Sequence, residues 1–242
     1  MKLIKAVPGR TFVLSAMVLI PVCAFATEGQ VLINQSAVMA AGGFPYKITE
    51  SGNYKLSSNL VVTSTAAGAI AIGPGHGPLS VTLDLGGFTI SGPGATSSGI
   101  GIAVNTGNVS VMNGFVQGFN IGAAGSFMRL TDLVFSQNGT GVFNVTEGMV
   151  VTRCHFLSNR QTGIQGGSVV LDSVAVGNGG DGFVFADVLL NSLSFANSGH
   201  GAYGIKIYGS NSFGANTLGD VAQPGGGGVS QHNNACNNGA VC

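Results

Sequence analysis

Four nine-residue stretches decide the fold: LTDLVFSQN at 130–138, VTRCHFLSN at 151–159, VLDSVAVGN at 170–178 and LLNSLSFAN at 189–197. Each begins with an apolar residue and ends in Asn, and a further Asn follows at the same interval. The series is Asn138, Asn159, Asn178, Asn197 and Asn216, with spacings of 21, 19, 19 and 19 residues. Short alternating segments separated by Gly or Asn are typical of strands joined by tight turns. The period therefore indicates a chain built from structural repeats.

A repeat of about 20 residues limits the possible folds. It is shorter than the roughly 30 residues of a strand–helix–strand unit, but it can hold three short strands and three corners. Coils of this size, wound one after another, pair equivalent strands in parallel about 4.8 Å apart and bury their inward residues only against neighbouring coils. The sequence predicts an all-β, single-domain parallel β-helix, or solenoid, with coils of about 19–21 residues.

The recurring Asn residues are expected to form an internal ladder. A buried amide without hydrogen-bond partners costs about 1 to 3 kcal/mol, and stacking gives each side chain a partner in the coils above and below. The alternative is that Asn and Gly only mark exposed turns. Buried polar groups are nearly always hydrogen-bonded in proteins, which favours the inward ladder.

The recurring pattern V-x-L-x-x-(C/S)-x-F-x-x-N-x-x-x-G-I resembles that of right-handed parallel β-helix proteins of the pectate-lyase-like superfamily. The stretches 33–48, 51–56 and 81–90 are similar to the openings of exported bacterial β-helix proteins of unassigned activity. The resemblance covers nearly the whole chain after residue 26 and implies right-handed coils. Because many unrelated activities share this scaffold, it implies little about function.

The first 26 residues have the pattern of a secretory signal peptide. They combine a basic start, an apolar run at 12–22 and the small-x-small end Ala24-Phe25-Ala26. One alternative is a membrane anchor, but the apolar run is shorter than the roughly 20 residues that span a bilayer. The other is a lipoprotein signal that uses Cys23. We expect cleavage before Thr27, export to the periplasm or the extracellular space, and no membrane span.

The remaining chain divides into three segments by pattern. We expect an N-terminal cap at 27–48, the β-helix at 49–220 and a C-terminal tail or cap at 221–242. Within the first segment, residues 34–41 are expected to form a short amphipathic helix. Both ends need a cover, because an open solenoid end exposes its core and its strand edges.

Composition excludes several functional classes. Charged residues make up 7% of the chain and apolar residues 45%, with a formal net charge of zero. Charge-driven disorder requires the opposite balance, and a nucleic-acid binder requires an excess of Lys and Arg. Removal of the three basic residues Lys2, Lys5 and Arg10 with the signal leaves six basic and nine acidic residues, net −3. No metal site and no cofactor are expected.

Three cysteines follow the signal segment. Cys236 and Cys242 are separated by a flexible spacer, and an exported protein meets oxidising conditions, so we predict a disulfide between them. The rival reading is a metal pair assisted by His232, but no fourth ligand is evident. Cys154 lies in an alternating apolar context and is expected to be a small core residue.

No recognisable catalytic set is present. Gly75-His76-Gly77 and Gly199-His200-Gly201 resemble pieces of the polygalacturonase pattern, but the Asn-Thr-Asp and Asp-Asp motifs of that family are missing. No acid–base pair can therefore be carried over from it. Arg153, Asp132, Asp172 and His200 remain as the least poor catalytic candidates.

One column of residues lies six positions before each ladder position and is expected to point outward. Its members are Leu85, Asn113, Asp132, Arg153, Asp172, Asn191 and Ser210. Opposite charges on neighbouring strands support each other by about 0.2 to 1 kcal/mol, so a stabilising charge ladder is one reading. The other is a binding groove formed by Asp132, Arg153, Asp172 and Asn191, in which Arg153 would bind an acidic sugar.

A second outward set is apolar. It comprises Phe115, Val134, Leu157, Val174, Val176, Leu193 and Phe195, two or four positions before the ladder. Large exposed apolar patches usually mark a partner surface, here a second copy or the C-terminal tail. A register slip of one residue would instead send these side chains inward.

Two functional hypotheses follow. The preferred one is a non-catalytic exported β-helix protein that acts as a structural, adhesive or carbohydrate-contacting surface. The alternative is a polysaccharide lyase or glycoside hydrolase acting on uronate-type polymers through an unrecognised catalytic set.

Overall fold

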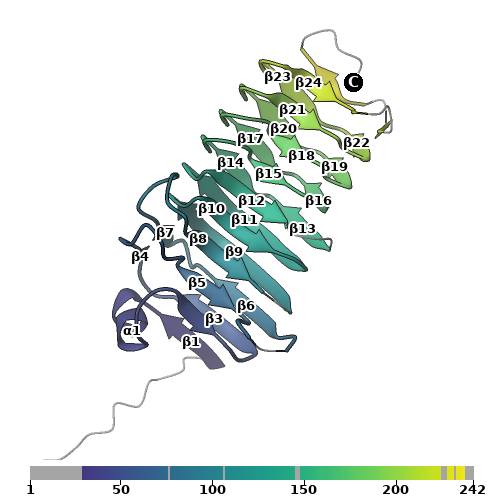
Figure 1. Ribbon diagram of the computed structural model, residues 1–242. Helices are drawn as coiled ribbons and strands as arrows, with labels where there is room; N and C mark the ends of the chain where they lie inside the picture. Colours follow the sequence, from purple (N-terminus) through teal and green to yellow (C-terminus); the bar gives the residue numbers. More distant parts are fainter. Residues whose placement is uncertain are drawn as a thin grey trace, which may run out of the picture.

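The computed structural model describes residues 29–75, 77–105, 107–144, 148–224, 228–231 and 233–237. Within them the chain forms a parallel β-solenoid of the right-handed type with about nine turns (Figure 1). All strand pairings are parallel, and each strand pairs with its equivalent in the next coil. The predicted β-helix is thereby confirmed.

The strands line three faces of the stack, the first two belonging to one 17-stranded sheet and the third being a 9-stranded sheet. The first face contains β1 (Gln30–Ile33), β3 (Gly52–Leu56), β6 (Ser80–Asp84), β9 (Asn108–Gln117), β11 (Met128–Ser136), β13 (Met149–Thr152), β16 (Ser168–Leu171), β19 (Val188–Leu190), β22 (Ile207–Gly209) and β25 (Val229–Ser230). The second face contains β4 (Leu60–Val61), β7 (Thr89–Ser91), the ends of β9 and β11, β14 (His155–Leu157), β17 (Val174–Val176), β20 (Leu193–Phe195), β23 (Ser212–Gly214) and β26 (Ala235–Cys236). The third face contains β2 (Tyr46–Ile48), β5 (Ile70–Ile72), β8 (Ile100–Val104), β10 (Ile121–Gly125), β12 (Thr140–Asn144), β15 (Ile164–Gln165), β18 (Phe183–Val184), β21 (His200–Tyr203) and β24 (Gly219–Ala222).

Columns of residues with positive φ make the corners between the faces. At the corner between the first and second faces they include Asp132 (φ 54°), Arg153 (52°), Asp172 (50°) and Asn191 (52°). Asn and Asp tolerate the left-handed region better than most residues because their short side chains bond locally. Backbone geometry therefore accounts for most of the residue types in this column, whatever else it does.

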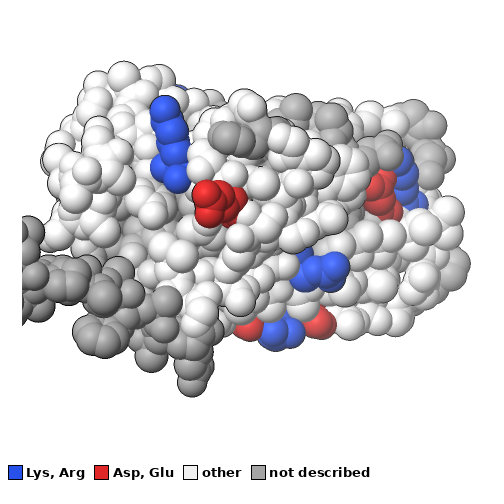
Figure 2. All heavy atoms as spheres, turned by 90° about the horizontal axis from the view of Figure 1, so that it is seen from below, with Lys and Arg blue, Asp and Glu red and all other residues white. Residues whose placement is uncertain are grey.

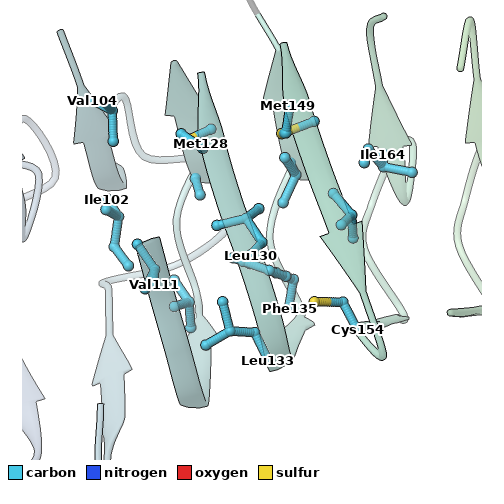
Figure 3. Packing of buried hydrophobic residues seen from close by; sticks show 14 of the residues in the cluster. Ile102, Val104, Val111, Met128, Leu130, Leu133, Phe135, Met149, Cys154 and Ile164 are labelled. Carbon is cyan, nitrogen blue, oxygen red and sulfur yellow. The ribbon is translucent and has the colours of Figure 1, made fainter. Parts of the chain in front are cut away.

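The core is apolar and alternates with outward residues along each strand. On the second face, Phe135 pairs with Phe156 and Phe156 with Ala175, and all three are buried. Figure 3 shows part of this core, in which Val111, Leu130 and the Cys154 sulfur belong to one cluster. Cys154 is a free, fully buried cysteine, as expected of a small core residue.

The predicted Asn ladder is confirmed. All five Asn residues are buried, with at most 2% of their surface exposed. In each step the side-chain oxygen of one Asn accepts both the backbone N–H and the Nδ2 of the Asn one coil earlier. For Asn159 and Asn178 these distances are 3.1 and 2.9 Å. The fully buried Asp220 ends the ladder by accepting from Asn216 Nδ2 at 3.1 Å.

A second polar ladder runs along the corner between the first and second faces. In each step the backbone N–H of one residue donates to the side-chain oxygen of its equivalent in the next coil, at 2.9 to 3.2 Å. The residues in order are Cys154, Ser173, Ser192, Asn211 and Asn234. In the sequence this ladder is visible only as the Cys or Ser position of the repeating pattern, five residues before the Asn ladder.

Strand pairing crosses both predicted segment boundaries. Parallel pairing runs through the expected cap and tail, since β1 pairs with β3 at one end and β25 and β26 pair with β22 and β23 at the other. A short helix, α1 (Gln35–Ala40), lies near the N-terminal end of the stack (Figure 1) and places Val38 in the core. Its role as a cap stays a prediction.

Other expectations are corrected or lie outside the described residues. Leu85, expected to point outward, is fully buried, because residues 85–88 form a wider turn in that coil and Gly87, not Leu85, donates to Asn113. The signal segment 1–26, His76, His232 and Cys242 lie outside the described residues. The predicted Cys236–Cys242 disulfide therefore stays a prediction.

Candidate functional site

The charged column lies at the corner between the first and second faces. Arg153 Nε is 2.7 Å from Asp132 Oδ1, and Arg153 Nη2 is 2.7 Å from Asp132 Oδ2, which makes a two-pronged ion pair. This hydrogen bonding lowers the pKa of Asp132 and raises that of Arg153, and the charge of Asp172 raises the pKa of Arg153 further. Both side chains of the pair are exposed to solvent.

This geometry limits what Arg153 can bind. Arginine recognises a carboxylate best with two parallel N–H groups, and Asp132 already accepts two such groups of Arg153. Asp132, Arg153, Asp172 and Asn191 stand on consecutive coils, as their pairing shows. The structure therefore brings the predicted column together, whereas its binding role stays a prediction.

His200 stands apart from that column, on β21 of the third face. Its Nδ1 is 3.0 Å from Asp181 Oδ1, which also accepts the His200 backbone N–H at 2.6 Å. The ring lies 5.4 Å from that of Tyr203, which in turn packs edge-on against Phe185. Asp181 was not among the site residues predicted from the sequence. It lies 19 residues before His200, which is one repeat earlier, and this spacing could have identified it.

The outward apolar strip has the predicted orientation. Val134 pairs with Phe115, Val174 with Leu193 and Val176 with Phe195, and each of these side chains is half-buried or exposed. At the C-terminal end the strip borders a shallow depression of about 290 Å³ lined by residues that include Leu193, Phe195 and Phe213. Lys, Arg, Asp and Glu are sparse on the face of the molecule that Figure 2 shows.

A feature not anticipated from the sequence lies at the corner between the third and first faces. Phe127 (φ 53°) and Phe185 (φ 53°) have left-handed backbones and are 59% and 47% exposed. A bulky residue with positive φ is uncommon. Each ring lies over a glycine of the following coil, Gly148 and Gly204 respectively, where an added Cβ would come within 2.6 Å of the ring. Glycine in the next coil thus makes room for each ring.

Phe127 borders a second depression, of about 170 Å³. The other lining residues are Asn108, Val109, Ser110, Met128, Arg129, Gly148 and Val150. Arg129 is exposed, and no carboxylate among the described residues lies within ion-pair distance of it. Within the described residues, no ion pair engages the Arg129 guanidinium, whereas Asp132 engages that of Arg153.

Two further observations concern the described part of the chain. No three His, Cys, Asp or Glu side chains there gather closely enough to hold a metal ion. No helix in that part is long and apolar enough to cross a membrane.

Comparison with known proteins supports the fold alone. No model of a known protein family matches the chain, and no curated protein matches it. Among solved structures, the Dettilon tailspike protein (gp208) is similar, with a TM-score of 0.51 and 13% sequence identity. The match covers 75% of this chain and 46% of the tailspike chain, so this chain corresponds to less than half of that protein. The chain thus shares a parallel β-helix with a tailspike protein.

Proposed function

We propose that the protein is an exported, non-catalytic β-helix that presents a carbohydrate-contacting surface. The observation that carries the proposal is the set of exposed aromatic side chains on the outside of a stack of paired coils: Phe115, Phe127, Phe185 and Phe195 are 43 to 59% exposed. An aromatic ring offers a flat apolar surface against which the apolar face of a sugar ring packs. Asn, Ser and Asp side chains at the corners would bind the hydroxyl groups.

Three observations support a contact role over catalysis. Arg153 is engaged by Asp132, His200 lies on a different face from the charged column, and the exposed aromatic rings stand on paired strands or corners. Sites on regular elements hold their geometry without further ordering, which lowers the entropic cost of binding. The shared fold with a tailspike protein supports a role at an exposed surface.

A glycan array tests the proposal with the chain from residue 27 onward. We expect binding to a subset of extended polysaccharides, and weaker binding after each substitution Phe→Ser at positions 115 and 195. Asn53→Ser, at an exposed position on β3, is the matched control and is expected to leave binding unchanged. Absence of binding to every class of glycan would overturn the proposal.

The alternative function is a polysaccharide lyase or hydrolase, and one observation favours it. Asp181 orients the His200 imidazole through Nδ1, and no hydrogen bond to Nε2 is formed by the part of the chain that the structure describes. A general base requires this arrangement. Formation of unsaturated products or new reducing ends from uronate polymers, lost in His200→Ala and retained in Arg160→Gln, would establish this function.

The apolar strip suggests self-association as a further property. A second copy would cover the side chains of Val174, Leu193 and Phe195, which are half-buried or exposed. Light scattering of wild type and Leu193→Lys distinguishes the outcomes. A dimer that Leu193→Lys dissociates would support association through the strip, whereas a monomeric wild type would exclude it.

A further inference from the structure

The depression beside Phe127 has the chemistry of a binding site that the internal structure does not use. Arg129 stands on the outward side of β11, where it pairs with Ser110 in the preceding coil and with Val150 in the following one. Its guanidinium has no acidic partner among the described residues. Ser110 and Asn108 line the same depression.

Phe127 forms the aromatic wall of this depression. It occupies a corner where left-handed backbone favours glycine, and the next coil has Gly148 at the equivalent place. The ring is 59% exposed and contributes little to the core. Positive φ recurs at the corners of this stack, so the exposure of the ring, and not its backbone, sets Phe127 apart. A large apolar ring that stays in solvent adds little to stability.

We propose that this depression, defined by Asn108, Ser110, Phe127 and Arg129, binds a sugar unit that carries an anionic group, either a carboxylate or a sulfate. Arg129 binds the anion through paired N–H groups, Phe127 packs against the sugar ring, and Ser110 and Asn108 bind hydroxyls. The inference rests on the proposed carbohydrate-contacting function and specifies its ligand. It also moves the acidic-sugar role from Arg153, which already donates two N–H groups to Asp132, to Arg129.

The position of Phe185 extends the site along the axis. Phe185 lies at the same corner three coils after Phe127, because β19 follows β11 through β13 and β16. With strands about 4.8 Å apart, the two coils that carry these residues are roughly 14 Å apart along the axis. A polymer lying along this edge would therefore contact both rings, so a longer oligosaccharide is expected to bind more tightly than a single unit.

The test uses Arg129→Gln and Phe127→Gly, the latter chosen because glycine relaxes the left-handed backbone. Arg160→Gln is the matched control, since Arg160 is exposed at a different corner and its loss changes the net charge equally. The probes are oligogalacturonate (carboxylated), dextran sulfate (sulfated) and neutral dextran, titrated by calorimetry. Thermal unfolding confirms that each variant is folded.

We expect Arg129→Gln to weaken binding of one anionic probe by about tenfold or more. Phe127→Gly should weaken binding of the same probe without lowering the midpoint of thermal unfolding. Arg160→Gln should leave this binding unchanged. The preferred probe distinguishes carboxylate from sulfate. Equal losses in Arg129→Gln and Arg160→Gln, or unchanged binding in Arg129→Gln, overturn the inference. If the inference is overturned but the variants bind other glycans as the wild type does, the proposed carbohydrate-contacting function survives. If the wild type binds no glycan, both the inference and the proposed function fail.

Discussion

Replacement of Asn178 by Leu tests the ladder in the middle of the stack. The Asn178 side chain accepts the Asn159 N–H at 3.1 Å and Asn159 Nδ2 at 2.9 Å, and it donates to Phe156 O at 3.1 Å and to Asn197 Oδ1 at 2.8 Å. Leucine removes all four bonds. Two neighbouring hydrogen bonds remain in the variant: the backbone N–H of residue 178 still donates to Asn197 Oδ1, and Asn159 Nδ2 still donates to Phe135 O.

Two donor protons are left without an acceptor, one on the Asn159 backbone and one on its side chain. Each buried unsatisfied group costs about 1 to 3 kcal/mol, so the variant is expected to lose about 2 to 6 kcal/mol in free energy of unfolding. Urea unfolding followed by circular dichroism measures the loss as a shift of the midpoint multiplied by the slope. Asn53→Leu, the same change at an exposed outward position, should cost less than about 0.5 kcal/mol.

Equal midpoints for Asn178→Leu and Asn53→Leu would refute the ladder. A double-mutant cycle sharpens the test, because the side chains of Asn159 and Asn178 share a hydrogen bond. The double variant Asn159→Leu/Asn178→Leu should lose less than the sum of the two single losses, by about 0.5 to 3 kcal/mol. Strict additivity would mean that the two amides do not interact.

Three further predictions concern packing, charge and reactivity. Gly141→Ala places a Cβ 2.3 Å from Gly163 O and should cost about 1 to 3 kcal/mol in thermal or urea unfolding, whereas Gly77→Ala meets nothing within 4 Å and should cost little. Arg153→Gln should lower stability slightly at neutral pH and low salt. Because Arg153 lowers the pKa of Asp132, the difference from wild type should begin to shrink below the ordinary Asp value of 3.8 and be lost only as the pH falls through the lowered pKa of the folded protein. A difference that persists once Asp132 is protonated in the folded protein would contradict the ion pair. Burial raises the pKa of Cys154 to about 12, so iodoacetamide should label it at mildly alkaline pH only after unfolding; rapid labelling of the folded protein would contradict its burial.

Much of the fold could be predicted because repetition makes the inward side of each coil visible in the sequence. Asn138 to Asn216 recur at the coil length, and Phe135, Phe156 and Ala175 fall at the same place relative to them. The second polar ladder was missed because Cys, Ser and Asn share no obvious pattern. Only their stacking in the structure shows that they form one continuous series of hydrogen bonds. The series includes Cys154, Ser173, Ser192 and Asn211.

The candidate site was less predictable. The sequence placed Asp132, Arg153 and Asp172 on neighbouring coils, but it could not tell that Asp132 takes up two N–H groups of Arg153. Phe127 and Arg129 carried no signal, because they do not belong to the repeating pattern. A residue that departs from a repeat becomes informative only when the structure shows what surrounds it.

The sequence by itself indicated the parallel stacking and the coil length, and it favoured an inward Asn ladder and an outward apolar strip, both of which the structure confirms. These properties depend on spacing along the chain, and a constant spacing brings equivalent residues into contact. The tertiary structure alone decided which charges neutralise each other, that Asp181 orients His200, and that Phe127 and Arg129 border one depression. Those relations depend on corner geometry and side-chain direction, which differ from coil to coil and leave no period in the sequence.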